Sequence, residues 1–157
     1  MRTSYPIQIL VALLLNFQFS CQPKPVVLNQ AASITALGEL DENPLLLHAV
    51  TTAVDLNKNQ MSTLYANQIG ANYAMHFQTN DFPTGSQLYQ VTWERQPDSL
   101  WFGAFIPGKL ISVELINFEN DQLAHYSLFN AELIHQKPSN DSLRTVQILS
   151  QPRAVSP

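Results

Sequence analysis

Histidine is the residue type in this chain best suited to bind a metal ion or a haem iron near neutral pH. The four histidines form no H-x-x-x-H or H-E-x-x-H pair, and their spacing matches no metal-binding motif; they are His48, His76, His125 and His135. His76 is the strongest candidate, because it would share a helix face with Tyr65 and Tyr73 and could act as an axial ligand. Packing of His76 on those tyrosines near a helix end is the simpler interpretation.

A second candidate site is aromatic. Trp93, Trp101 and Phe105 could line an apolar ligand pocket, with His76 as a ligand at its edge. The simpler interpretation is that these rings form the core of a β-sheet, where aromatic pairs are a common source of stability.

The composition excludes several classes of site. The formal net charge is -4 at pH 7 and the basic residues are scattered, which argues against a nucleic-acid partner. Cys21 is the only cysteine, so the remainder of the chain can hold no disulfide, no thiolate metal site, no iron–sulfur cluster and no c-type haem. Glu94 and Glu114 fall on the polar sides of expected strands and should be solvated, unless the strands bring them together as an acid–base pair.

The first 20 residues have the layout of a bacterial secretory signal peptide. A basic start at Arg2 precedes a largely apolar stretch over residues 7–15, and Cys21 directly follows the small Ser20. A membrane-spanning helix needs about 20 apolar residues, and this stretch is shorter. A lone cysteine here resembles a lipobox, where lipoproteins are cleaved and acylated, although Gln18 stands where the usual pattern has Leu. A plain secreted protein and an uncleaved N-terminal anchor are the alternatives.

The elements that would position these residues indicate an α+β fold, an antiparallel β-sheet meander with flanking N-terminal helices. Periodicity predicts a helix over residues 60–78 and a shorter one over 41–50, with an extended conformation through Val54 as the alternative to the latter. Alternating apolar residues predict a strand over residues 87–94 with one buried face. The remaining strand-like runs are residues 101–106, which would be a central strand, 110–116, 122–129, a short edge segment over 131–136, and 143–149.

We expect four parts along the chain. They are a lipoprotein signal peptide over residues 1–20, a tether over 21–37, a single domain over 38–150 and a disordered tail over 151–157. The tether is predicted because prolines are followed there by small and polar residues with little periodicity. It would lift the domain off a membrane surface.

Three pieces of the chain together resemble the cytochrome P460 domain family. They are residues 61–67 (MSTLYAN), residues 82–93, which contain FPTGS and VTW, and residues 101–114, which contain WFGA, IPG and VE. The resemblance covers residues 45–129 and is strongest to short bacterial lipoprotein members that lack the haem c motif. It implies an antiparallel β-sheet domain with flanking helices, often a homodimer, in the periplasm.

Haem-bearing members of that family bind a c-type haem and act on hydroxylamine, or bind small gases. This chain has no C-x-x-C-H after Cys21, so the resemblance carries over the fold and not the activity. We therefore expect no covalent cofactor, and a lipid-anchored binding or accessory module on the periplasmic or cell-surface side of a bacterial membrane. An oxidoreductase or gas-binding protein that holds haem non-covalently is the alternative. An interaction protein that dimerises without a small ligand is the third hypothesis.

Lipidation of Cys21 can be tested by the substitution Cys21→Ser. Acyl chains hold a protein on a bilayer through about 0.8 kcal/mol for each buried CH₂ group. The substitution should therefore move the protein from the membrane fraction into the soluble fraction, as measured by fractionation and immunoblotting. Unchanged membrane partitioning would contradict the prediction.

Overall fold

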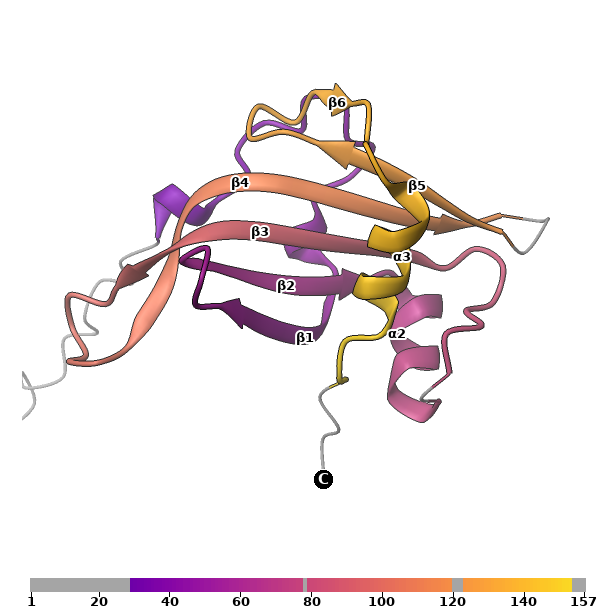
Figure 1. Ribbon diagram of the computed structural model, residues 1–157, viewed down its shortest axis with the longest axis horizontal. Helices are drawn as coiled ribbons and strands as arrows, with labels where there is room; N and C mark the ends of the chain where they lie inside the picture. Colours follow the sequence, from indigo (N-terminus) through magenta and orange to yellow (C-terminus); the bar gives the residue numbers. More distant parts are fainter. Residues whose placement is uncertain (1–28, 78, 120–122, 154–157) are drawn as a thin grey trace, which may run out of the picture.

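Six antiparallel strands form one sheet in the part of the chain that the computed structural model describes, residues 29–77, 79–119 and 123–153 (Figure 1). The strands lie in the sheet in chain order, and each pairs with the next one along the chain. They are β1 (His48–Asp55), β2 (Gln60–Ala66), β3 (Gln87–Pro97), β4 (Phe105–Phe118), β5 (Ala124–Phe129) and β6 (His135–Gln136). The predicted antiparallel meander is confirmed.

Two α-helices complete the α+β class that the sequence predicts. One is α2 (Gln68–His76), which connects β2 to β3, and the other is α3 (Asp141–Leu149), which follows β6. Two short 3₁₀ turns, η2 (Gln30–Ala32) and η3 (Pro44–Leu46), precede β1. The helices therefore flank the sheet from the middle and the end of the chain, and the predicted placement of both helices at the N-terminus is wrong.

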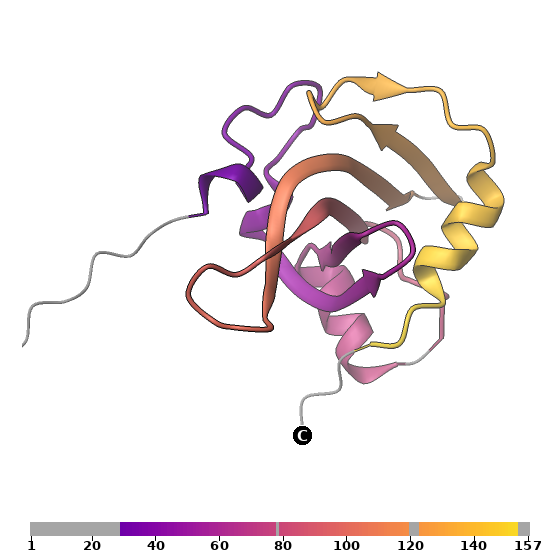
Figure 2. The same cartoon turned by 60° about the vertical axis from the view of Figure 1, so that its left-hand side comes forward.

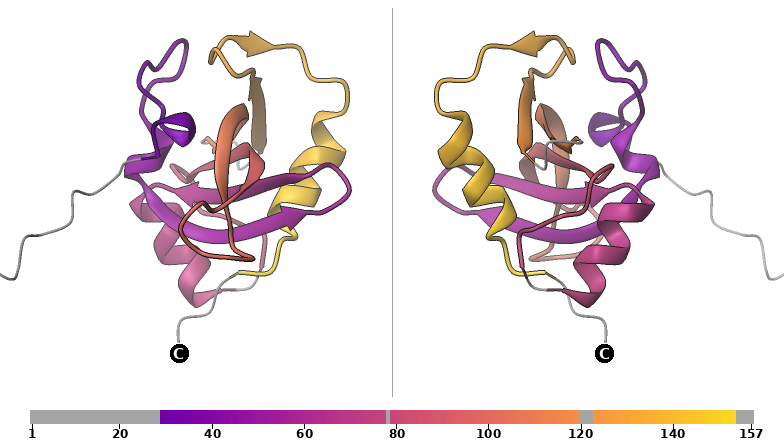
Figure 3. Two further views of the ribbon diagram at one scale, coloured as in Figure 1. Left: turned by 90° about the vertical axis from the view of Figure 1, so that its left-hand side faces the viewer. Right: turned by 90° about the vertical axis from the view of Figure 1, so that its right-hand side faces the viewer.

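Strand β3 contributes to a separate core on each side of the sheet, as its predicted alternation requires. Its odd positions, from Tyr89 to Trp93, are buried on the side that we call the N-terminal face, together with Ile34, Leu40 and Leu133. Leu88 is buried on the opposite side, the helical face, together with Ala71 and Ala74 of α2, Ile148 of α3 and Ile116 of β4. Figure 3 shows the N-terminal segment and α3 on opposite sides of β4 and β5.

Two irregularities bend β4. Thr92 pairs with Ser112, Trp93 pairs with Leu110 and Arg95 pairs with Pro107, so β4 holds an extra residue at each of two places. Such β-bulges increase the local twist and bend a strand. Figure 2 shows β4 arching strongly along its length. Gly108 lies in this bend, where a Cβ atom would come within 3.1 Å of the backbone oxygen of Glu94.

The helix predicted over residues 60–78 is only half correct, because it begins at Gln68. Residues 60–66 pair with β1 on one side and with β3 on the other, which satisfies their backbone hydrogen bonds as a strand. Asn67 then starts α2: its side-chain oxygen accepts a hydrogen bond from the backbone N–H of Gly70 at 3.0 Å. The shorter predicted helix, over residues 41–50, is also wrong, since only η3 forms there and the extended alternative describes β1.

Two predicted strands are not strands. Residues 101–106 were expected to form a central strand, but β4 begins only at Phe105 and the preceding residues form the turn after β3. Residues 143–149 lie in α3, whose buried positions are Thr145 and Ile148. A spacing of three between buried residues fits a helix and not a strand.

The ends of the domain extend further than predicted. Within the predicted tether, the backbone oxygen of Ala32 accepts a hydrogen bond from Trp93 Nε1 at 3.0 Å, and Ile34 is buried. Within the predicted tail, the backbone oxygen of Pro152 accepts one from Thr51 at 2.7 Å, and Arg153 bonds the backbone oxygen of Phe77. Residues 29–37 and 151–153 therefore belong to the domain. The signal peptide and Cys21 lie outside the described residues.

A pair of alanine substitutions tests the helical assignment of α3. Ile148 is 1% exposed and Val146 is 61% exposed, although a strand would turn both to the same side. We expect Ile148→Ala to lower the free energy of unfolding by about 2–4 kcal/mol. Val146→Ala should change it by less than about 0.5 kcal/mol. Urea unfolding measures both, and equal losses would contradict the helix.

Candidate functional site

Two adjoining cavities lie on the helical face, between the β1–β2 turn and α3. Their volumes are about 180 and about 420 Å³, and both are lined by Lys58, Gln60, Thr92 and Arg144. We call the combined hollow the polar groove. Most of its other lining side chains are polar; these are Asp55, Ser62, Gln90, Ser112, Glu114, Tyr126, Ser139, Asn140, Gln147 and Gln151. Its size falls in the range of small-molecule sites.

A row of three hydroxyl side chains crosses the floor of the polar groove. Ser62 on β2 is paired with Thr92 on β3, which in turn is paired with Ser112 on β4. Residues that are paired across antiparallel strands project from the same face, so the three hydroxyls stand side by side. Among the described residues, neither Thr92 nor Ser112 makes a side-chain hydrogen bond within the protein. Their hydroxyls can therefore donate to and accept from a bound molecule.

The buried carboxylate of Glu114 forms the inner end of the polar groove. Glu114 is 4% exposed. Arg144 donates to it from Nε and from Nη2, each at 2.6 Å, and the Tyr126 hydroxyl donates to Oε1 at 2.5 Å. Two parallel bonds from a guanidinium give a strong, directional ion pair. The negative charge of Glu114 is therefore neutralised inside the protein.

This network fixes the protonation states around Glu114. Burial, reinforced by the hydrogen bond to Glu114, raises the pKa of Tyr126. The hydrogen bond to Glu114 also raises the pKa of Arg144, against the opposite effect of burial. Tyr126 stays a neutral donor and Arg144 stays a cation throughout the physiological pH range.

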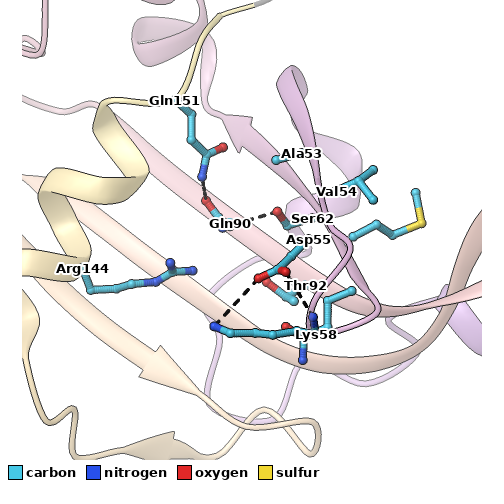
Figure 4. Close-up of a pocket in the computed structure, with 11 residues that line it drawn as sticks. Ala53, Val54, Asp55, Lys58, Ser62, Gln90, Thr92, Arg144 and Gln151 are labelled. Atoms are coloured by element: carbon cyan, nitrogen blue, oxygen red, sulfur yellow. Dashed lines mark hydrogen bonds and ion pairs between the residues drawn. The ribbon is translucent and has the colours of Figure 1, made fainter.

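The other polar lining groups are also largely paired. Gln90 is 3% exposed; it accepts a hydrogen bond from Gln151 Nε2 at 2.6 Å and donates to Ser62 Oγ at 3.4 Å. Figure 4 shows this chain of three residues, with Arg144 reaching from α3 toward the strands. Lys58 lies 4.0 Å from Asp55 at the exposed mouth. The polar groove thus contains two cations and two carboxylates, each facing an opposite charge.

The structure does not bring the predicted pocket residues together. Trp93 is 3% exposed in the core of the N-terminal face, while Trp101 is 71% exposed in the β3–β4 turn. Phe105 lies under the Arg95 guanidinium, which is 4.0 Å from the ring centre. His76 is exposed at the end of α2, where Nδ1 is 2.7 Å from the backbone oxygen of Asn72.

Haem ligation through His76 does not fit this arrangement. The ring is in solvent, and none of the residues that line the polar groove is a histidine. Over residues 29–77, 79–119 and 123–153, no three His, Cys, Asp or Glu side chains form a group that could hold a metal ion.

Sequence reasoning missed Glu114, which was expected to be solvated. The available signal was its position in the otherwise apolar run from Val113 to Ile116, where a charge is costly unless it is paired. Its partner could not be identified in the same way, because Arg144 is 30 residues away and lies in a helix that was predicted as a strand.

Comparison with known proteins adds no relative: no protein-family model and no curated protein sequence matches this chain. In the part of the chain that the structure describes, no helix is long and apolar enough to cross a bilayer. The geometry of the polar groove is therefore the basis for the functional argument.

The buried ion pair should matter more for stability than the exposed one on the same face. Arg144→Met leaves the Glu114 carboxylate without its cation, which in fully buried pairs costs about 3–5 kcal/mol. Because the Arg144 side chain is 37% exposed, we expect a smaller loss in the free energy of unfolding, about 2–3 kcal/mol.

Lys58→Met is the matched control, since the Lys58 and Asp55 side chains are 70% and 43% exposed, and it should cost less than about 1 kcal/mol. Adding Glu114→Gln to Arg144→Met should recover part of the loss, because no buried charge then remains. Denaturant titration measures each variant. Equal losses in Arg144→Met and Lys58→Met would show that the buried pair does not hold α3.

Proposed function

We propose that this protein is an exported, lipid-anchored binding module that holds a small, uncharged polar molecule in the polar groove. The observation that carries the proposal is the hydroxyl row of Ser62, Thr92 and Ser112. Two of its three hydroxyls have no hydrogen-bond partner among the described residues, although they line a hollow of sufficient size for a sugar or a dipeptide amide.

The charges around the polar groove favour an uncharged ligand. Glu114 is already neutralised by Arg144, and Asp55 faces Lys58. A charged ligand would have to compete for one of these partners, and leaving a buried charge unpaired is costly. Hydroxyl and amide groups on the ligand can instead pair with Thr92 and Ser112 without disturbing the ion pairs.

The same network favours binding over acid–base chemistry. A general acid or base must be free to exchange a proton with a substrate. The Glu114 carboxylate accepts bonds from Arg144 and Tyr126, and the Tyr126 pKa is raised. The Tyr126 hydroxyl therefore keeps its proton, and both Glu114 oxygens are already engaged by donors within the protein.

The export and anchoring part of the proposal rests on the signal-like start of the chain and on Cys21. The cytochrome P460-like identity of the domain is likewise a proposal, which the antiparallel meander supports at the level of fold class only. A homodimer is implied by that resemblance and is part of the same proposal.

The binding proposal can be tested by nuclear magnetic resonance on the Cys21→Ser protein. The probes are N-acetylglucosamine, glucose and the dipeptide amide glycyl-glutamine amide, each titrated while backbone amide shifts are recorded. At least one probe should shift amides near Thr92 and Ser112. Thr92→Val should then weaken binding about fivefold, because one hydrogen bond contributes about 1 kcal/mol.

Thr52→Val is the matched control, because Thr52 lies on the N-terminal face, where its hydroxyl bonds Thr63 at 3.1 Å. It should leave the dissociation constant unchanged. If all three probes leave the groove amides in place, or if Thr52→Val weakens binding as much as Thr92→Val, the hydroxyl row is not the ligand site. Self-association without probe binding would favour an interaction protein instead.

A further inference from the structure

The turn between β3 and β4 holds three large apolar side chains in solvent. Leu100 is 81% exposed, Trp101 is 71% exposed and Phe102 is fully exposed. We call these three residues the apolar tip. Single exposed apolar residues are ordinary on a protein surface, but a run of three consecutive large ones usually marks a surface for binding a partner or a membrane.

The apolar tip has an ordered backbone. Asp98 accepts a hydrogen bond from the backbone N–H of Leu100 through Oδ1 at 2.7 Å, and its own N–H donates to the oxygen of Ala104 at 2.9 Å. The N–H of Ala104 donates to the oxygen of Trp101 at 3.0 Å, and Gly103 has φ +80°. A positive φ at the third residue of such a turn needs glycine. The exposed side chains are therefore presented by a defined turn.

The N-terminal segment joins the domain at the base of the same hairpin. Asn29 Nδ2 donates a hydrogen bond to the backbone oxygen of Pro107 at 2.5 Å, and the backbone oxygen of Ala32 accepts one from Trp93 Nε1. Pro107 and Trp93 lie on the two strands that lead to the apolar tip. Figure 1 shows the N-terminal segment and this hairpin at the same end of the sheet, away from α2.

Chain lengths allow the apolar tip and a lipid on Cys21 to reach one membrane surface. Phe102 is five residues from Pro107, which corresponds to at most about 17 Å of extended chain. Cys21 is eight residues from Asn29, which can span up to about 28 Å. The connection from the lipid is therefore longer than the distance by which the hairpin projects.

We infer that the apolar tip inserts into the lipid interface beside the lipid anchor, and this inference rests on the proposed lipidation of Cys21. Tryptophan prefers the boundary between headgroups and acyl chains, and leucine and phenylalanine enter the apolar layer. The charged groups at the neck of the hairpin are Arg95 and Lys109, opposed by Glu94 and Asp98. They balance one another, so insertion depends on apolar burial and not on anionic lipid.

Insertion of the apolar tip would set the orientation of the domain relative to the membrane. A lipid anchor alone lets a domain tumble, whereas a second contact at the hairpin fixes which end of the sheet meets the membrane. The polar groove then keeps a constant direction relative to the bilayer.

Quenching of tryptophan emission tests this inference with the full lipidated protein in vesicles of phosphatidylethanolamine and phosphatidylglycerol that carry brominated acyl chains. Trp101 should lose at least half of its emission. Trp101→Phe leaves Trp93 as the reporter, which is buried and should stay unquenched. Leu100→Ser with Phe102→Ser should abolish the quenching of Trp101. Met75→Ser is the matched control, because Met75 is 64% exposed on α2 at the other end, and it should leave the quenching intact.

The outcomes separate this inference from the anchor. Membrane attachment that depends on Cys21, without quenching of Trp101, would overturn the tip inference and leave the anchor in place. Quenching of Trp101 when the Cys21→Ser protein is added to vesicles would support the tip even if the native chain carries no lipid. A concentration-dependent blue shift of Trp101 without vesicles would overturn the inference in favour of a second copy of the chain.

Discussion

The pairing of β3 with β4 is the constraint on which the rest of this structure depends. Its register sets Leu88 opposite Ile116, then Gln90 opposite Glu114, then Thr92 opposite Ser112, all on the helical face. From Leu88 toward Thr92, the paired residues on the helical face change from apolar core residues to a buried polar pair and then to hydroxyls without a side-chain partner among the described residues. A slip of one residue would turn this set to the other face and exchange it with Tyr89 and Val91. The core of the helical face and the polar groove therefore both depend on this one register between β3 and β4.

Helix α3 contacts both the apolar part and the buried polar part of this face. Ile148 packs into the apolar core, whereas Arg144, one turn earlier, binds Glu114 at the polar end. Burial of Ile148 stabilises the packing of α3 on the sheet. The Arg144–Glu114 ion pair fixes the angle at which the helix lies, because a bidentate ion pair tolerates little rotation. A wall of the polar groove is thus positioned by an interaction whose charges cancel, which leaves the hydroxyl row as the part that is open to a ligand.

The sequence predicted what local patterns determine and missed what distant contacts determine. The alternation from Gln87 to Glu94 correctly predicted β3, because the two-residue period of a strand repeats four times within these eight residues. Residues 60–66 read as helix, since Met61 and Tyr65 are spaced as on one helix face, but pairing with two neighbouring strands overrides that preference. Trp101 was assigned to the core because large apolar residues are usually buried, and here it is exposed. The pairing of Glu114 with Arg144 could not be predicted, since no local pattern joins a residue in a strand to one in a distant helix.

The last described residues form hydrogen bonds with residues that are far away in the sequence. Gln151 bonds Gln90 across 61 positions, and Pro152 bonds Thr51 across 101. Contacts of such high sequence separation form late, since the entropy of closing a long loop opposes them. During synthesis, the helical face therefore lacks these contacts until residues 151 and 152 have emerged. For a chain that we propose is exported, this delays completion of the fold, so that the polypeptide can still be threaded through a membrane before the domain becomes stable.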